Sequence, residues 1–267
     1  MLGSARGITD HLDHSLIGAD PSDLTTAGIV DVEKLAMSKH IGIVACSAEG
    51  ASLCYRTICA EGPRHLGSHA HPEVSLHTHS LADYVACLDR GDIDGIGDLM
   101  LASAFKLQAA GADFLICPDN TIHQAMDYVT ARSPLPWLHI TEVVAAEAAA
   151  KGHRRVALLG THWLMDSDVY PVKLQARGIA CVRPEPADRN RLGEIIVTEL
   201  VYGVFDPQSI VFVEKVIARL KEEEGCDAVA LACTELPLIL GDANSALPTL
   251  DSTRLLARAA LAHALSH

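Results

Sequence analysis

Two short polar segments carry side chains that exchange protons, and each directly follows an apolar run. Asp119-Asn120-Thr121 comes after "FLICP", and Cys233-Thr234-Glu235 comes after "AVALA". A carboxyl group and a thiol on opposite faces of a small substrate suit proton transfer at carbon, because one group removes a proton while the other delivers one. Taken singly, Asp119 is also typical of a helix cap and Cys233 of a buried thiol.

Apolar runs of strand length alternate with helix-like segments along most of the chain. This alternation predicts βαβ units, parallel strands and right-handed crossovers. The expected strands cover residues 41–46, 73–80, 113–118, 137–140, 155–161, 179–184 and 227–233. The expected helices cover residues 48–59, 98–111, 141–151, 165–178, 210–225 and 253–265, and two more begin at residues 120 and 234. Because ligands bind at the carboxyl ends of parallel strands, both polar segments fall where a site is expected.

The pattern repeats within the chain. Gly225 follows Gly111 by 114 positions (225 − 111), and Cys233 follows Asp119 by the same interval (233 − 119). A Gly-x-Asp before a strand is common in α/β proteins, but the shared interval favours a true repeat. We therefore predict an α/β fold of two pseudo-symmetric flavodoxin-like halves, each a mostly parallel sheet flanked by helices, with the active site in the cleft between them. The halves are expected at residues 40–140 and 141–250.

The two ends of the chain are harder to interpret. Residues 1–39 show only weak periodicity and are treated as an N-terminal extension of unknown role. Part of the C-terminal segment 251–267 is expected to pack on the first half, although its apolar helix would suit a partner surface equally well.

From residue 41 to residue 262 the chain resembles the aspartate/glutamate racemase family. The first motif of that family, C-N-T-x-H, corresponds to Asp119-Asn120-Thr121-Ile122-His123, and the second, G-C-T-E, to Ala232-Cys233-Thr234-Glu235. A Gly-Thr followed by a tyrosine lies between them, at Gly160, Thr161 and Tyr170. Members usually carry cysteine at both acid/base positions and Gly-Gly after the first strand, whereas this chain has Asp119 and Ala45-Cys46.

The resemblance implies an isomerase, an amino-acid racemase or epimerase that needs neither pyridoxal phosphate nor metal, with Asp119 and Cys233 as the acid-base pair. It also implies a homodimer. Asp and Cys differ by about 4.6 pKa units in free peptides, a mismatch on the order of 6 kcal/mol that burial of Asp119 and a helix start at Cys233 would narrow. Two alternatives stay open: a one-cysteine decarboxylase or cis-trans isomerase of the same superfamily, and a non-catalytic protein that binds a small carboxylate.

Further polar residues at the predicted strand ends are expected to hold the substrate, an amino acid or other small carboxylate. Backbone N–H groups at helix starts bind such anions. The expected substrate-binding residues are Ser47, His79, Asn120, Thr121, Thr161, Thr234 and Glu235. The paired His-x-His segments at residues 69–71 and 77–79 lack further ligands at metal-like spacing, so we predict no metal site.

Composition narrows the class of partner. A net charge of −13 argues against nucleic acid and anionic membranes. No apolar run reaches the length of about 18 residues that spans a bilayer, and the first residues lack the pattern of a secretory signal. Eight cysteines in 267 residues are too sparse for a disulfide framework. The expected location is therefore the cytoplasm.

Overall fold

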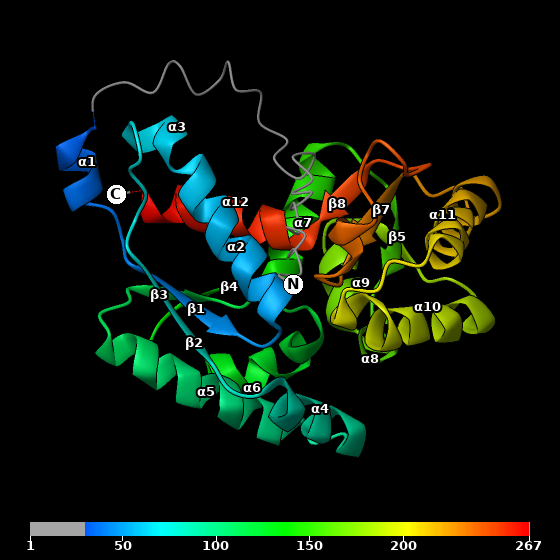
Figure 1. The fold of residues 1–267 in the computed structure, drawn as a ribbon, viewed down its shortest axis with the longest axis horizontal. Coiled ribbons are helices and arrows are strands. Elements are labelled where there is room, and N and C mark those ends of the chain that lie inside the picture. The colour runs from blue at the N-terminus through cyan, green and yellow to red at the C-terminus, as the bar shows by residue number, and fades with distance from the viewer. Residues whose placement is uncertain (1–29, 267) are drawn as a thin grey trace, which may run out of the picture.

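The computed structural model describes residues 30–266, which form two four-stranded parallel sheets flanked by helices (Figure 1). The strand order is β2-β1-β3-β4 in the first sheet and β6-β5-β7-β8 in the second, so the two sheets have the same topology. The strands are β1 (Ile41–Ala45), β2 (Val74–Thr78), β3 (Phe114–Ile116), β4 (Trp137–Leu138), β5 (Arg155–Leu159), β6 (Ala180–Val182), β7 (Ala228–Leu231) and β8 (Thr249–Asp251).

Helices connect the strands and cover both faces of each sheet (Figure 1). The α-helices are α1 (Val32–Ala36), α2 (Ala48–Glu61), α3 (Pro63–Leu66), α4 (Leu81–Arg90), α5 (Ile93–Ala109), α6 (Met126–Thr130), α7 (Ile140–Ala150), α8 (His162–Met165), α9 (Val169–Gln175), α10 (Pro186–Thr198), α11 (Pro207–Glu222) and α12 (Ser252–Ala264). Three short 3₁₀ segments are η3 (Thr121–Ala125), η4 (Leu200–Tyr202) and η5 (Leu236–Leu238). Within residues 30–266, no helix is both long and apolar enough to cross a membrane.

The repeat predicted from Gly111 and Gly225 is a structural repeat. Both glycines have positive φ, 94° and 66°, and end the helix before the third strand of their half. The aspartate two residues later then caps the start of the neighbouring strand. Asp113 accepts from the N–H of His40 at 2.7 Å, and Asp227 accepts from the N–H of Arg154 at 2.8 Å. These matching contacts and the shared strand order confirm two pseudo-symmetric α/β halves, while the boundaries 40–140 and 141–250 stay a prediction.

Each sheet is buried between layers of apolar side chains. The first sheet has two such layers: Val44 and Leu115 point to the side of α5, whereas Ile43 and Ile116 point to the other side. The C-terminal helix α12 supplies Leu256, Ala257, Ala260 and Ala264 to this second layer. The last helix of the chain therefore completes the core of the first half.

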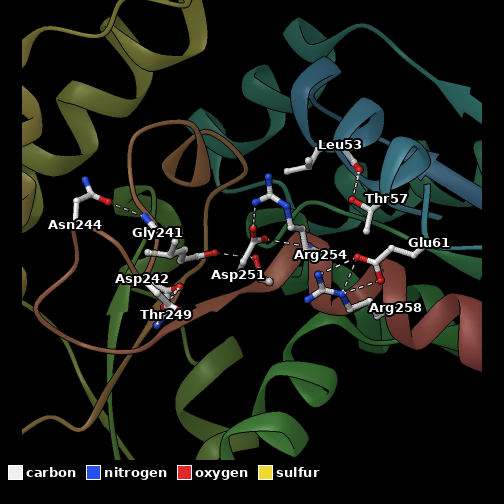
Figure 2. Close-up of polar contacts among 12 residues, drawn as sticks. Leu53, Thr57, Glu61, Gly241, Asp242, Asn244, Thr249, Asp251, Arg254 and Arg258 are labelled. Carbon is white, nitrogen blue, oxygen red and sulfur yellow. Dashed lines mark hydrogen bonds and ion pairs between the residues drawn. The ribbon is translucent and has the colours of Figure 1, made fainter. Parts of the chain in front are cut away.

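Polar contacts fix α12 as it crosses from the second sheet to the first half (Figure 2). Asp251, the last residue of β8, accepts from the N–H of Arg254 at 3.0 Å and caps the helix. One turn later Arg258 holds Glu61 at the end of α2 with both Nε and a terminal nitrogen, at 2.9–3.0 Å. The helix thus links the edge of one sheet to the outer helix of the other.

Several predicted elements differ from those in the structure. The helix expected at residues 165–178 is broken into α8 and α9, because Ser167 bonds the carbonyl of Leu164 at 2.7 Å and accepts from the N–H of Val169. Short polar side chains compete with helical hydrogen bonds in this way. Strand β8 and helices α4 and α10 were not expected at all.

The helix expected from residue 120 begins as the 3₁₀ segment η3 and continues as α6, whereas the helix expected from residue 234 is only the 3₁₀ segment η5. η5 is only three residues long and contains Pro237, which lacks an N–H. The predicted N-terminal extension falls largely outside the described residues, since residues 1–29 are not described. Residues 30–39 include α1, and the N–H of Lys39 bonds the carbonyl of Ala264 at 2.9 Å.

Candidate active site

The middle strands of each sheet end side by side. In the first half Ile43 pairs with Ile116, so Cys46 and Asp119 both lie three residues beyond that pair. In the second half Leu159 pairs with Leu231, the last residue of β7, and Cys233 lies two residues beyond it. The structure therefore places Asp119 and Cys233 after the equivalent strands of the two halves, β3 and β7, as the internal repeat predicts.

The strand tips of the two halves touch each other. The hydroxyl oxygens of Thr121 and Thr161 are 2.9 Å apart, and those of Ser47 and Thr234 are 3.2 Å apart. Gly50 of the first half also lies close to the second half, because a Cβ added to it would lie 2.4 Å from Cγ2 of Thr234. Four of the predicted site residues thus form direct contacts between the halves.

Asp119 caps the 3₁₀ segment that follows it. Its Oδ1 accepts from the N–H of Thr121 at 3.0 Å and from the N–H of Ile122 at 3.3 Å. The cap uses only Oδ1, so Oδ2 is not part of it. These two N–H groups are consequently engaged by Asp119, so their predicted contact with a substrate anion stays a prediction that the present hydrogen bonds do not favour.

Burial raises the pKa of Asp119, as expected from the sequence. The carboxylate of Glu235 raises it further, whereas hydrogen bonds from the N–H groups of Ile122 and Thr121 lower it. A higher pKa makes this carboxylate a better proton acceptor than a solvent-exposed aspartate.

Cys233 is paired with the carboxylate two residues along. Its Sγ donates to Oε2 of Glu235 at 2.9 Å, and the hydroxyl of Thr234 donates to the same oxygen at 2.8 Å. Burial, followed by this carboxylate, raises the pKa of Cys233 well above its usual value. The predicted lowering by a helix start is therefore wrong, because η5 is short and the negative charge of Glu235 is adjacent.

Asn120 is engaged within the protein. Its Nδ2 donates to the hydroxyl of Ser252 at 2.9 Å, and its Oδ1 accepts from the hydroxyl of Tyr170 at 2.7 Å. Ser252 in turn donates to the carbonyl of Leu231 at 2.9 Å. Asn120 is buried and joins the first strand tip to α9, α12 and β7, so its predicted contact with substrate stays a prediction that its present hydrogen bonds do not favour.

The remaining predicted residues lie at helix starts or at the sheet edge. Ser47 caps α2 by accepting from the N–H of Gly50, and Thr161 caps α8. His79 follows β2, where the pairing of Ala45 with Thr78 places it next to Cys46. Its Nε2 is buried and has no hydrogen-bond partner within residues 30–266.

No group of three or more metal-ligating side chains occurs in the described part of the chain. Of the predicted histidine pairs, His77 bonds Ser103 through Nδ1 and Lys106 through Nε2, both at 2.9 Å. Its ring nitrogens are therefore occupied by protein contacts.

Cys46 is the site residue that the sequence reasoning missed. Burial, followed by the negative charge of Asp119, raises the pKa of Cys46 well above its usual value, and its side chain packs in the apolar layer on the α5 side of the first sheet. Both residues follow apolar strands, but their adjacency depends on a strand register across 73 positions (119 − 46). No local pattern in the sequence reports that register.

These features can be set beside known proteins. The sequence profile of the Asp/Glu/Hydantoin racemase family matches residues 41–260. The chain belongs to this family. A curated relative, the broad specificity amino-acid racemase RacX of Bacillus subtilis strain 168, is 25% identical over 178 residues, which cover 66% of this chain and 75% of that protein.

Solved structures agree with the family assignment. A candidate Asp/Glu racemase from Yersinia pestis is 28% identical with a TM-score of 0.78, covering 85% of this chain and 100% of that one. An aspartate racemase homologue from Pyrococcus horikoshii OT3 is 26% identical with a TM-score of 0.75 and the same coverage. Glutamate racemase from Aquifex pyrophilus, at 21% identity and a TM-score of 0.56, shares the fold. The racemase homologues support an isomerase.

Proposed function

We propose that this protein is a racemase or epimerase that moves a proton at the α-carbon of an amino acid or related carboxylic acid, with Asp119 and Cys233 on opposite faces of the substrate. The observation that carries the proposal is the position of these two residues after equivalent strands of two halves whose tips touch. The chemistry needs only the chain's own acid and base, so we propose that no cofactor takes part.

In one direction the Asp119 carboxylate removes the α-proton. The C–H bond breaks, an O–H bond forms on Asp119, and the electron pair is delocalised into the substrate carboxylate. Cys233 then donates its S–H proton to the opposite face, which leaves a thiolate next to Glu235. The reverse direction begins with protonated Asp119 and the Cys233 thiolate.

The start of α2 is the proposed binding site for the substrate carboxylate. This helix is 14 residues long, and its capping residue Ser47 contacts Thr234 of the other half. A helix start presents backbone N–H groups and a partial positive charge to an anion. The start of α2 takes the place of η3 as the proposed carboxylate-binding site, because the first N–H groups of η3 are bonded to Asp119.

The charges of the site favour substrates without a second carboxylate. Asp119 and Glu235 already place two carboxyl groups between the halves. The Glu235 carboxylate raises the pKa of Asp119, and both carboxylates raise the pKa of Cys233. An acidic side chain on the substrate would add a like charge. Neutral amino acids are therefore the proposed class, and the name of the Bacillus subtilis relative likewise describes a broad specificity.

The test is interconversion of enantiomers across a panel of neutral and acidic amino acids, followed by chiral chromatography. The proposal predicts that the protein converts each enantiomer of at least one neutral amino acid into the other, and that Cys233→Ala abolishes the conversion. Cys226→Ala is a matched control, because Cys226 is also buried but precedes β7 at the opposite end of the strand. A panel with no inversion would remove the proposal.

One observation favours a second candidate, a reaction that needs a single proton donor, such as decarboxylation or cis-trans isomerisation. Asp119 is engaged as a cap, so Cys233 could act alone. Asp119→Asn separates the two candidates, since the amide still accepts a hydrogen bond but cannot take up the α-proton. A racemase loses its activity in this variant, whereas a one-cysteine enzyme keeps a measurable rate.

A homodimer in the cytoplasm stays our proposal for the assembly and its location. The apolar face of α12, which the sequence offered as a partner surface, is buried within the chain instead. Sedimentation at micromolar protein concentration tests the dimer, and a single species of 28.4 kDa would remove it.

A further inference from the structure

A cavity of about 420 Å³ lies between the two halves, and none of the predicted catalytic or substrate-binding residues lines it. The first half contributes His123, Asp127 and His139 to its wall, and the second half contributes Asp166 and Lys173. Binding sites for small molecules usually measure about 300–1,000 Å³. The cavity is therefore large enough for a small ligand, which would touch both halves outside the proposed active site.

His123 is a buried residue of this wall with one acceptor that no protein group satisfies. Its Nε2 lies 3.1 Å from the carbonyl oxygen of Cys117, and because a carbonyl can only accept, this nitrogen carries the hydrogen. Burial, followed by the nearby ring of His139, lowers the pKa of His123 well below its usual value, so the ring is neutral at pH 7. Nδ1 is therefore a bare acceptor, and it is buried without a hydrogen-bond partner among residues 30–266.

Asp127 is a second acceptor without a protein partner. It lies four residues after His123, where η3 continues into α6, a spacing that places two side chains on one side of a helical segment. The other carboxylates of the wall are neutralised, since Asp166 pairs with Arg189 and Asp168 with Arg183. Asp127 has no ion pair within the part of the chain that the structure describes.

The long donor side chains of the wall are already engaged. Nζ of Lys173 donates to Oε1 of Glu142 at 2.6 Å, and Nε2 of Gln124 donates to the carbonyl oxygen of Thr121 at 3.0 Å. The unmatched groups are therefore acceptors, and one of them is anionic. A ligand that complements them must donate hydrogen bonds and carry a positive charge.

We propose that this cavity binds a small aliphatic amine, which donates to Nδ1 of His123 and places positive charge beside Asp127. Apolar side chains from both halves, Met126, Val169 and Val172, also line the cavity and would cover the hydrocarbon part of the ligand. The inference goes beyond the proposed function, because it assigns a second ligand to residues that have no part in proton transfer.

The first experiment measures binding to the full chain by calorimetry at pH 7. The probes are cadaverine, a diamine, and the diol with the same carbon chain, so that only one of the two is charged. The variants are Asp127→Asn and His123→Gln; the glutamine amide can still donate to the Cys117 carbonyl but has no acceptor in place of Nδ1. Asp89→Asn is the matched control, because Asp89 is also exposed but does not line the cavity. Thermal unfolding checks that each variant is folded.

The wild type should bind cadaverine at least about tenfold more tightly than the diol, as expected for hydrogen bonds to a charged group. Asp127→Asn and His123→Gln should each weaken cadaverine binding by about tenfold, and Asp89→Asn should not. Cadaverine that binds no better than the diol, or that binds Asp127→Asn as tightly as Asp89→Asn, overturns the inference. Binding that disappears in Cys233→Ala places the amine in the proposed active site and overturns it as well.

The second experiment follows the ring of His123 itself by NMR of protein with isotope-labelled histidine. The Nδ1 signal of His123 should move as cadaverine is added, because an unpaired nitrogen gains a donor. His40 is the internal control, since its Nε2 already lies 2.9 Å from the hydroxyl of Ser75 and it does not line this cavity. A His123 signal that stays unchanged while cadaverine binds places the amine elsewhere and overturns the inference. Neither experiment measures turnover, so a failure of the proposed function leaves both results interpretable.

Discussion

Replacement of Gly50 by alanine should push the start of α2 against both strand tips and remove activity from a folded protein. Gly50 lies in the first turn of α2, where a Cβ would meet the carbonyl oxygen of Pro118 at 2.5 Å and Cγ2 of Thr234 at 2.4 Å. Ordinary van der Waals contacts begin at 3.4 Å, so the added Cβ would lie about 0.9 Å too close to the carbonyl oxygen of Pro118. Pro118 directly precedes Asp119, and Thr234 directly follows Cys233, so the displacement falls on both candidate acid-base residues.

The expected effect on activity exceeds the effect on stability. Alanine stabilises a helix by roughly 0.5–1 kcal/mol relative to glycine, whereas overpacking costs about 1–3 kcal/mol, which leaves a net loss of about 0–2.5 kcal/mol. A displacement of about 1 Å in a catalytic geometry lowers the rate by about 10²-fold. Urea unfolding and the rate of enantiomer inversion measure the two effects separately.

Gly241→Ala is the matched control, because no atom lies within 4 Å of the Cβ that it would add. It should retain wild-type activity. The double variant Gly50→Ala/Thr234→Ser removes Cγ2 but not the Pro118 carbonyl, so only part of the activity should return. If Gly50→Ala matches Gly241→Ala in both stability and rate, the start of α2 does not lie as close to the two strand tips as described, and the proposed arrangement of Asp119 and Cys233 around it is wrong.

Three further predictions concern residues around the site. Tyr170→Phe should lower the free energy of unfolding by about 1–3 kcal/mol, because Oδ1 of buried Asn120 loses its donor; an unchanged urea midpoint would contradict this. Burial lowers the pKa of His139 to about 4, below the unfolded value of about 6.5, so its contribution to stability is present above pH 6.5 and is lost as the pH falls toward 4. His139→Asn retains an acceptor for the N–H of Thr141 but does not titrate, so its melting temperature should fall less than that of the wild type between pH 7 and pH 5; parallel losses would refute the assignment. Asp119→Cys removes a negative charge and a cap, so it should accept acidic amino acids better, act at more alkaline pH and lose about 0.5–2 kcal/mol of stability; a stability loss without a changed substrate profile would make Asp119 structural only.

The features that the sequence predicts correctly are those with local causes. Gly111 and Gly225 are required where the backbone turns with positive φ after a helix, and Asp113 caps the start of the strand next to its own. Because both halves need the same turn and the same cap, the interval of 114 positions (225 − 111) could be read without a structure. Buried parallel strands are likewise apparent from continuous apolar runs.

The features that the sequence did not predict depend on partners distant in the chain. Cys46 looks like an ordinary buried thiol until the pairing of β1 with β3 places it beside Asp119. Asn120 looks available to a substrate until Tyr170 and Ser252 are brought to its side chain.

The most direct test of proton transfer between opposite faces is the isotopic content of the inverted product. A single enantiomer of a neutral amino acid is incubated with the wild-type protein in deuterated water, and early product is isolated by chiral chromatography and examined by mass spectrometry. Because one group removes the proton and the other delivers a solvent-derived one, every inverted molecule should carry one deuteron at the α-carbon while the remaining substrate stays largely unlabelled. Inverted product that retains the original proton, or α-deuterium in the substrate without inversion, would contradict transfer between Asp119 in the first half and Cys233 in the second.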